Sequence, residues 1–161
     1  MIKMELIDLN LISKEVVLLM LPTAIQKQID LGFEQSELPV IIKGNEERLR
    51  EMLYNLLDNA IRYTQEGGRV TMATNVSAEG VALIVEDNGP GVPVAERDKI
   101  FDRFHRVVGS EQEGSGLGLA IVQEIAKLHG ANISLAEASP DGGLKITVLF
   151  NKLESNLRLA F

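Results

Sequence analysis

The chain has 161 residues, no cysteine, and a formal net charge of −7 from 16 basic and 23 acidic side chains. Its length fits a single domain, and its content of 45% apolar and 24% charged residues is ordinary for a soluble globular protein. These features exclude disulfides and thiolate metal sites, argue against nucleic acid as the main partner, and leave no apolar run near the roughly 20 residues of a membrane span.

The first third of the chain predicts a strand, a helix and two further strands. Apolar and polar residues alternate over 3–11, which predicts a short strand, and helical spacing over 12–29 predicts a helix that Pro22 should kink or divide. Residues 31–35 and 40–42 are short segments that could be paired strands. The inner face of the helix should carry Ile12, Val16, Leu19, Ala24 and Ile29.

A second helix is predicted over residues 45–64. Asn45 is a good N-cap, and the two glutamates that follow it suit the first turn of a helix. The apolar stripe consists of Leu49, Met52, Leu53, Leu56, Leu57, Ala60 and Ile61. One arc of about 80° on the margin of this stripe holds Glu51, Asn55, Asn59 and Arg62. These polar groups form either a solvated rim or the shell of a ligand or metal, and the helix alone favours the rim.

The remainder of the chain predicts hairpins and one more helix. Gly67 and Gly68 should end the second helix. Strands 69–76 and 81–86 form a hairpin, and residues 96–106 read as a helical turn followed by a loop. The last elements are a helix over 117–129 and strands over 132–136 and 143–150. The third helix should turn inward Leu117, Ile121, Ile125 and Leu128.

Three helices and about seven strands, several in antiparallel hairpins, predict an α/β (α+β) two-layer sandwich. One mixed, mostly antiparallel sheet should be covered by the helices. We place one domain at residues 3–150 and leave residues 151–161 as a tail of unknown role.

The richest stretch for chemistry is 82–119, which has the features of a nucleotide site. A buried strand leads to Asp87, whose carboxylate can accept a hydrogen bond from an exocyclic amine. Glycines after it let the backbone come close to a ring or a phosphate. A second glycine cluster opens a helix, whose free N–H groups favour anions. The spacing of the second glycine cluster differs from the G-x-G-x-x-G fingerprint of dinucleotide-binding proteins, so we set the dinucleotide-binding class aside.

Four motifs resemble those of the catalytic ATP-binding domain of two-component sensor histidine kinases. N-L-L-D-N-A-I-R-Y at 55–63 is similar to the family's N box, and E-D-N-G-P-G-V at 86–92 to its first glycine box. I-F-D-R-F-H-R at 100–106 resembles the F box, and G-S-G-L-G-L-A-I at 114–121 the second glycine box. The resemblance covers residues 3–150, in the family's order and spacing.

The resemblance implies a role for each matching position around the base and the metal. Asp87 would accept a hydrogen bond from the adenine N6 amine, and Gly89 and Gly91 would let the backbone approach the base. Asn59 matches the amide that binds Mg²⁺, which bridges the phosphates of ATP. Asn55 matches a second polar contact in the same region.

Further positions match the phosphate region and the ATP lid. Arg62 and Arg106 would be cations near the phosphates, and with Asn55 they are the candidate catalytic residues. Phe101 and Phe104 would anchor a mobile lid, or are plain core residues. The hinge and phosphate rim would consist of Gly114, Gly116 and Gly118, and Leu117 and Leu119 are further candidate ATP-binding residues.

The other aromatic and imidazole side chains have plainer interpretations. Tyr63 would pack beside the nucleotide by the resemblance, although simple helix packing is the favoured explanation. Arg106 has the alternative of a solvated charge. His105 lies inside the F box and is not expected to be the phosphoacceptor. His129 precedes Gly130 at a helix end and reads as a capping or surface residue.

By this resemblance the chain would transfer the γ-phosphoryl group of ATP to a histidine on a dimerisation domain that it lacks. No H-E-x-x-x-P stretch is present. The implied partners are that domain and a response regulator, without nucleic acid or direct membrane contact. The implied place is the cytoplasmic part of an inner-membrane sensor. Two alternatives stay open: a slow ATPase of the gyrase or MutL kind, which would carry glutamate where Asn55 stands, and an ATP-binding regulator of a partner protein.

Overall fold

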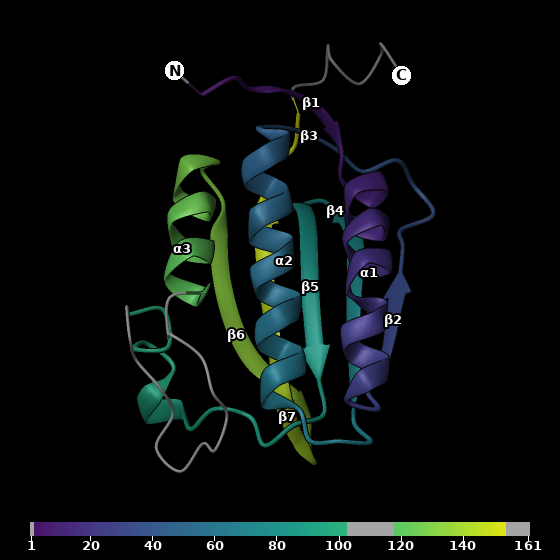
Figure 1. Cartoon of the computed structure of the whole chain (residues 1–161). Coiled ribbons are helices and arrows are strands. Elements are labelled where there is room, and N and C mark those ends of the chain that lie inside the picture. Colours follow the sequence, from purple (N-terminus) through teal and green to yellow (C-terminus); the bar gives the residue numbers. More distant parts are fainter. Residues whose placement is uncertain (1, 103–117, 154–161) are drawn as a thin grey trace.

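The computed structural model describes residues 2–102 and 118–153 and shows two layers (Figure 1). Three helices lie side by side on one face of a sheet: α1 (Leu9–Gln26), α2 (Glu46–Tyr63) and α3 (Gly118–Leu128). A 3-10 turn, η1 (Val94–Glu96), follows the central strands. The predicted sandwich of three helices on a mixed sheet is confirmed.

The described strands form two sheets, not the single sheet predicted. The larger has the order β2-β4-β5-β7-β6 and the smaller pairs β1 with β3. Their bounds are β1 (Glu5–Asp8), β2 (Asp30–Glu34), β3 (Ile41–Gly44), β4 (Arg69–Ser77), β5 (Gly80–Asp87), β6 (Asn132–Ser139) and β7 (Gly142–Phe150). The predicted pairing of residues 31–35 with 40–42 is wrong, because β2 lies parallel to β4 and β3 lies antiparallel to β1.

Helix α1 begins earlier than predicted and is not divided. The Asp8 side chain accepts a hydrogen bond from the Leu11 N–H at 3.2 Å, and this cap starts the helix at Leu9. The helix then continues through Pro22 to Gln26. Leu19 was expected to face inward, but its side chain is 68% exposed. The stretch is apolar on all sides, so its periodicity could not identify the buried face.

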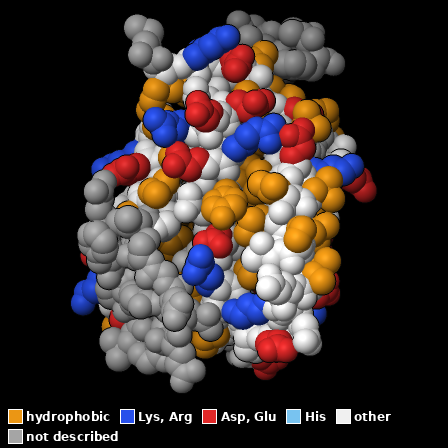
Figure 2. All heavy atoms as spheres, viewed as in Figure 1, with side chains coloured by type: hydrophobic (Ala, Val, Ile, Leu, Met, Phe, Trp, Pro, Cys, Tyr) orange, Lys and Arg blue, Asp and Glu red, His pale blue; other side chains and the backbone are white. Residues whose placement is uncertain are grey.

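Several large apolar side chains of α1 stay at the surface. Figure 2 shows apolar side chains gathered on the α1 side of this view, and exposed residues there include Leu11, Leu18 and Ile25. Among the described residues, α1 is the one helix that passes a length and composition test for crossing a membrane. Its opposite face is buried in the common core with α2 and the sheet, as in the core helix of a folded domain.

Helix α2 matches its predicted packing and differs at its end. Asn45 caps it as expected, since its side chain accepts from the Arg48 N–H at 3.0 Å, and the whole predicted apolar stripe is buried. The helix ends before the predicted glycine pair, with Thr64 already in extended conformation. Gly67 and Gly68 belong instead to the loop that leads into β4.

Helix α3 buries a different face from the one predicted. Its buried residues are Leu119, Ala120, Val122, Ile125 and Ala126. Ile125 is therefore the one predicted inward residue that is fully buried, while Leu128 is 42% exposed. Leu117 lies outside the described residues. The helix runs beside α2 (Figure 1), and small residues on its inner face fit this close neighbour.

His129 joins the end of α3 to the start of α2. Its Nε2 accepts a hydrogen bond from the Asn45 N–H at 3.1 Å, and its Nδ1 lies 2.8 Å from the Ile125 carbonyl oxygen. These partners require the neutral ring with the proton on Nδ1. The ring also meets Phe150 edge-on, with 6.2 Å between ring centroids. His129 is thus a half-buried link between two helices, and its contact with the Ile125 carbonyl in the last turn of α3 agrees with the capping alternative.

Gly44 leaves room for this link, which gives a stability prediction. A Cβ at Gly44 would lie 2.8 Å from Leu49 Cδ1 and 2.9 Å from His129 Cδ2. We expect Gly44→Ala to lower the free energy of unfolding by about 1–3 kcal/mol, measured by urea denaturation. Gly32→Ala in β2 is the control, because nothing lies within 4 Å of a Cβ there. Equal stability of the two variants would contradict the packing argument.

Candidate functional site

Asp87 stands at the end of the central strand β5, beside α2 and β7. Its Oδ1 accepts hydrogen bonds from the backbone N–H groups of Gly89 at 2.9 Å and Leu144 at 3.3 Å. Within the described part of the chain, Oδ2 receives no protein donor. Burial raises the pKa of Asp87 above its ordinary value, and the two N–H groups partly offset this effect. One oriented carboxylate oxygen therefore remains to accept a hydrogen bond from a ligand.

The loop after Asp87 packs tightly against the end of α2. A Cβ on Gly89 would lie 2.8 Å from the Tyr63 carbonyl oxygen and 3.1 Å from Asp87 Oδ1. Gly91 has a φ of +78°, a backbone conformation that favours glycine. Both glycines thus have a packing reason in the protein itself, beside any contact with a base.

Asn55 lies on the side of α2 that faces α3. It is close to Gly118, the first residue of α3. Its Nδ2 donates to the Glu51 carbonyl oxygen at 2.8 Å. A Cβ on Gly118 would lie 3.3 Å from Asn55 Oδ1. Gly118, from the second glycine box, therefore lies beside the Asn55 amide of the N box. Leu119, next along α3, is buried.

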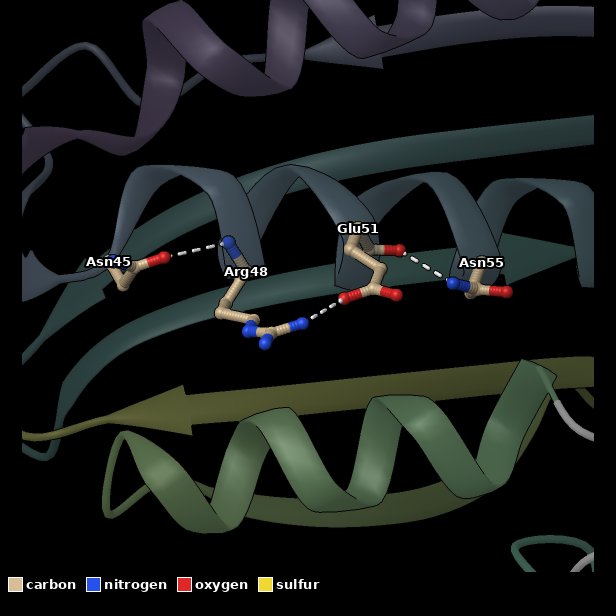
Figure 3. A network of polar contacts seen from close by, with 4 residues as sticks. All are labelled: Asn45, Arg48, Glu51 and Asn55. Carbon is tan, nitrogen blue, oxygen red and sulfur yellow. Dashed lines mark hydrogen bonds and ion pairs between the residues drawn. The ribbon is translucent and has the colours of Figure 1, made fainter. Parts of the chain in front are cut away.

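A polar network continues from Asn55 towards the start of α2 (Figure 3). Glu51 pairs with Arg48 at 3.1 Å, and the Arg48 N–H donates to Asn45. These contacts fit the interpretation of Glu51 as a rim residue. The network holds the Asn55 amide through the Glu51 carbonyl, while the Glu51 carboxylate pairs with Arg48.

Asn59 and Arg62 lie in the next turns of α2. Asn59 is half-buried, and Arg62 pairs with Asp58 at 2.9 Å. The Tyr63 side chain is half-buried, while its carbonyl supports Gly89. The amides of Asn55 and Asn59 and the guanidinium of Arg62 are thus carried on one helix whose end adjoins the Asp87 loop.

The other predicted site residues divide between the core and the segment that the structure does not describe. Phe101 is buried, with 9% of its surface exposed. The rest lie outside the described residues: Phe104, Arg106, Gly114, Gly116 and Leu117. The predicted lid over 107–113 and His105 also fall there.

The described residues hold no cluster of three or more His, Cys, Asp or Glu side chains that could bind a metal by themselves. An amide oxygen such as that of Asn59 is a hard donor of the kind Mg²⁺ accepts. Mg²⁺ at protein sites usually keeps several waters and takes phosphate oxygens. The Asn59 amide oxygen therefore fits a Mg²⁺ ion whose other ligands would be waters and phosphate oxygens.

Two parts of the site were missed in the sequence analysis, and both belong to β7. The N–H of Leu144 donates to Asp87, and Gly143 packs on the backbone of Asp87. Gly143 has a φ of +86°, and a Cβ there would lie 2.1 Å from the Asp87 carbonyl oxygen. The doublet Gly142-Gly143 at the start of a strand was the available signal.

Comparison with known families gives one match over most of the chain. Residues 44–154 match the model described as histidine kinase-, DNA gyrase B-, and HSP90-like ATPase. The sensor protein kinase PmrB of Pseudomonas aeruginosa is 38% identical over 92% of this chain and 31% of its own length. The swarming motility regulation sensor protein RssA of Serratia marcescens is 34% identical over 89% of this chain and 30% of its own length. The chain thus spans under a third of these relatives.

Solved structures with the same fold include the catalytic domain of a histidine kinase. The catalytic domain of histidine kinase ThkA superposes with a TM-score of 0.83 at 26% identity, covering 94% of this chain and 97% of that one. Full-length ShkA in complex with AMPPNP superposes with a TM-score of 0.79 at 30% identity, covering 98% of this chain and 33% of that one.

Proposed function

Because this chain belongs to the family of histidine kinase-, DNA gyrase B- and HSP90-like ATPases, we propose that it is the ATP-binding catalytic domain of a sensor histidine kinase. The observation that carries the proposal is the half-buried carboxylate of Asp87. Two backbone N–H groups hold its Oδ1, and its Oδ2 is left for a ligand.

In this proposal Asp87 selects adenine. Its carboxylate accepts a hydrogen bond from the N6 amine, and guanine carries an oxygen at that position, which would repel it. Gly89 and Gly91 have no side chains, so the base could approach the backbone beside the Asp87 carboxylate closely. Tyr63 supports this loop through its carbonyl group.

The phosphates are proposed to lie along α2, between Arg62 and the start of α3. Asn59 would bind Mg²⁺, which neutralises phosphate charge when it is bound. Asn55 would add a polar contact from the same helix, and Gly118 brings the N-terminus of α3 beside it. Arg106 and the rest of the second glycine box would complete the phosphate site from outside the described residues.

The described residues favour transfer over hydrolysis. An amide cannot take a proton from water at neutral pH, so Asn55 cannot act as the general base that a glutamate would provide. We propose that the acceptor is a histidine on a separate dimerisation domain and that a response regulator receives the phosphoryl group next. The relatives named as sensor proteins support a place in the cytoplasmic part of a membrane sensor.

Calorimetric titration of ATP, ADP and GTP, with and without Mg²⁺, tests the proposal. We expect ATP and ADP to bind, GTP not to bind, and Mg²⁺ to strengthen binding. A histidine-bearing dimerisation domain added in trans should then become phosphorylated. Absence of nucleotide binding would overturn the proposed function. Steady ATP hydrolysis by the chain alone would favour the slow ATPase instead.

Asn59→Ala should remove the effect of Mg²⁺ on ATP affinity, because the substitution deletes the proposed protein ligand to the metal. Calorimetry with ATP at several Mg²⁺ concentrations measures this. Asn75→Ala, at an exposed position in β4, is the matched control and should keep the Mg²⁺ dependence. If affinity in Asn59→Ala still rises with Mg²⁺, Asn59 does not bind the metal.

A further inference from the structure

Helix α2 ends without a glycine cap, although its last turns carry proposed site residues. The final carbonyl groups of a helix have no partner inside it and need donors from elsewhere. Thr64 follows α2 with φ −97° and ψ 135°, so the chain leaves the helix directly into extended backbone. The carbonyls of the last turn therefore need donors from water or from another segment.

Lys27, at the end of α1, supplies that donor. Its Nζ donates to the carbonyl oxygens of Ile61 and Arg62, each at 2.8 Å. A cation at a helix C-terminus is favourable, since the helix dipole is negative there. The ammonium thus caps the turn that carries Arg62 and leads into Tyr63.

Two backbone contacts hold the same pair of segments together. The Gly67 N–H donates to the Gln28 carbonyl oxygen at 3.0 Å, and the Asp30 N–H donates to the Gly68 carbonyl oxygen at 2.9 Å. The turn between α1 and β2 therefore binds the loop between α2 and β4 at Gly67 and Gly68, directly before β4. Lys27 makes the one side-chain contact among these, so a substitution can test it.

The loop between α2 and β4 in turn contacts the loop that follows Asp87. A Cβ on Gly89 would strike the Tyr63 carbonyl oxygen, and Gln65 Nε2 donates to the Asn88 carbonyl oxygen at 3.3 Å. The Asn88 side chain accepts from the Arg69 N–H at 2.7 Å. Contacts thus run without a break from Lys27 through residues 61–69 to Gly89, next to Asp87.

We propose that Lys27 is a positioning residue for the nucleotide site, which holds the last turn of α2 and, through it, the Asp87 loop in their binding geometry. This inference rests on the proposed function. Lys27 touches neither the proposed base site nor the proposed metal ligand, so its effect passes through the backbone of residues 61–64.

The surroundings of Lys27 disfavour its charged form. Burial first, and the positive charge of Arg62 second, lower the pKa of Lys27. Arg62 faces it from α2 and is itself paired with Asp58. At neutral pH the folded protein holds Lys27 charged in an unfavourable environment, which lowers the free energy of unfolding. This loss of stability disappears as pH rises through the lowered pKa of Lys27 towards the ordinary 10.5. The ammonium fits this place because two carbonyl oxygens accept hydrogen bonds from it.

Calorimetry with ATP on Lys27→Met, Lys27→Arg and the control Lys14→Met tests the proposal. Lys14 lies exposed on the same helix. We expect Lys27→Met to bind ATP about tenfold more weakly, and Lys27→Arg and Lys14→Met to bind as the native protein does. Equal affinity of Lys27→Met and the native protein would overturn the inference.

A pH series separates positioning from general packing. Native affinity should fall as pH rises through the lowered pKa of Lys27 towards the ordinary 10.5, while Lys27→Arg should change less because a guanidinium stays charged. Equal pH dependence in both would overturn the inference, and this comparison decides alone if Lys27→Met does not fold. Failure of the native protein to bind ATP would instead contradict the proposed function.

Discussion

Asp87→Asn should lower the affinity for ATP by about 10- to 150-fold, the loss of one charge-assisted hydrogen bond of about 1.5–3 kcal/mol. The asparagine Oδ1 can still accept from Gly89 and Leu144, which keeps the loop in place. Its amide group then stands where Oδ2 stood. A donor would face the donor of adenine N6, so the substitution reverses the contact without removing the side chain.

The same substitution should leave the free protein as stable as before, or more stable. Burial raises the folded-state pKa of Asp87 above the ordinary 3.8, so the folded chain keeps this proton to higher pH than the unfolded chain. Stability from this group is therefore fully present below about 3.8 and is lost as pH rises through the raised pKa. Asparagine has no such loss at neutral pH.

Titration calorimetry with ATP and thermal unfolding without ligand measure the two effects. Asp141→Asn, in the turn between β6 and β7, is the control and should change neither. Equal ATP affinity of Asp87→Asn and the native protein would contradict the assignment of adenine recognition to Asp87. A large loss of stability would show that the carboxylate is needed for folding.

Gly143→Ala should lower the free energy of unfolding by about 3 kcal/mol or more and abolish measurable ATP binding. The new Cβ would lie 2.1 Å from the Asp87 carbonyl oxygen, at a residue with a φ of +86°. Strain from φ contributes about 1–2 kcal/mol, and the clash with backbone adds the rest. Relief of the clash moves either Asp87 or the start of β7, which is why binding is lost with stability.

Gly67→Ala separates the two causes, because Gly67 has a φ of +87° but nothing within 4 Å of an added Cβ. It should cost about 1–2 kcal/mol from φ alone. Urea denaturation and ATP calorimetry on both variants measure the difference. Similar losses of stability in the two would mean that the contact between Gly143 and Asp87 is not the cause.

The parts of the fold that local pattern can specify were predicted well. Helix α2 has apolar residues on one side only, and its cap and its buried stripe agree with the prediction. Helix α1 is apolar on several sides, so Leu19 was wrongly placed inward. In α3 the same difficulty arises, since nearly every residue from Gly118 to Ala126 is apolar or small.

Long-range pairing was the part that the sequence could not supply. Nothing in residues 30–34 and 41–44 indicates that their partners are β4 and β1, because strand pairing depends on the connections made by the intervening helices. The same holds within the site. Asp87 and the Asn55/Asn59 pair stand out in sequence, whereas the Leu144 N–H is an ordinary backbone group that gains its role through β7 alone.

The position of β7 between β5 and β6 sets an order of events during synthesis. The donor Leu144 follows its acceptor Asp87 by 57 residues, and Gly143 must lie against the Asp87 backbone. A nascent chain that has emerged from the ribosome only as far as α3 already contains both N-box asparagines and the carboxylate. It still lacks the strand that fixes that carboxylate, so the capacity to bind nucleotide arises only when one of the last segments of the domain is made.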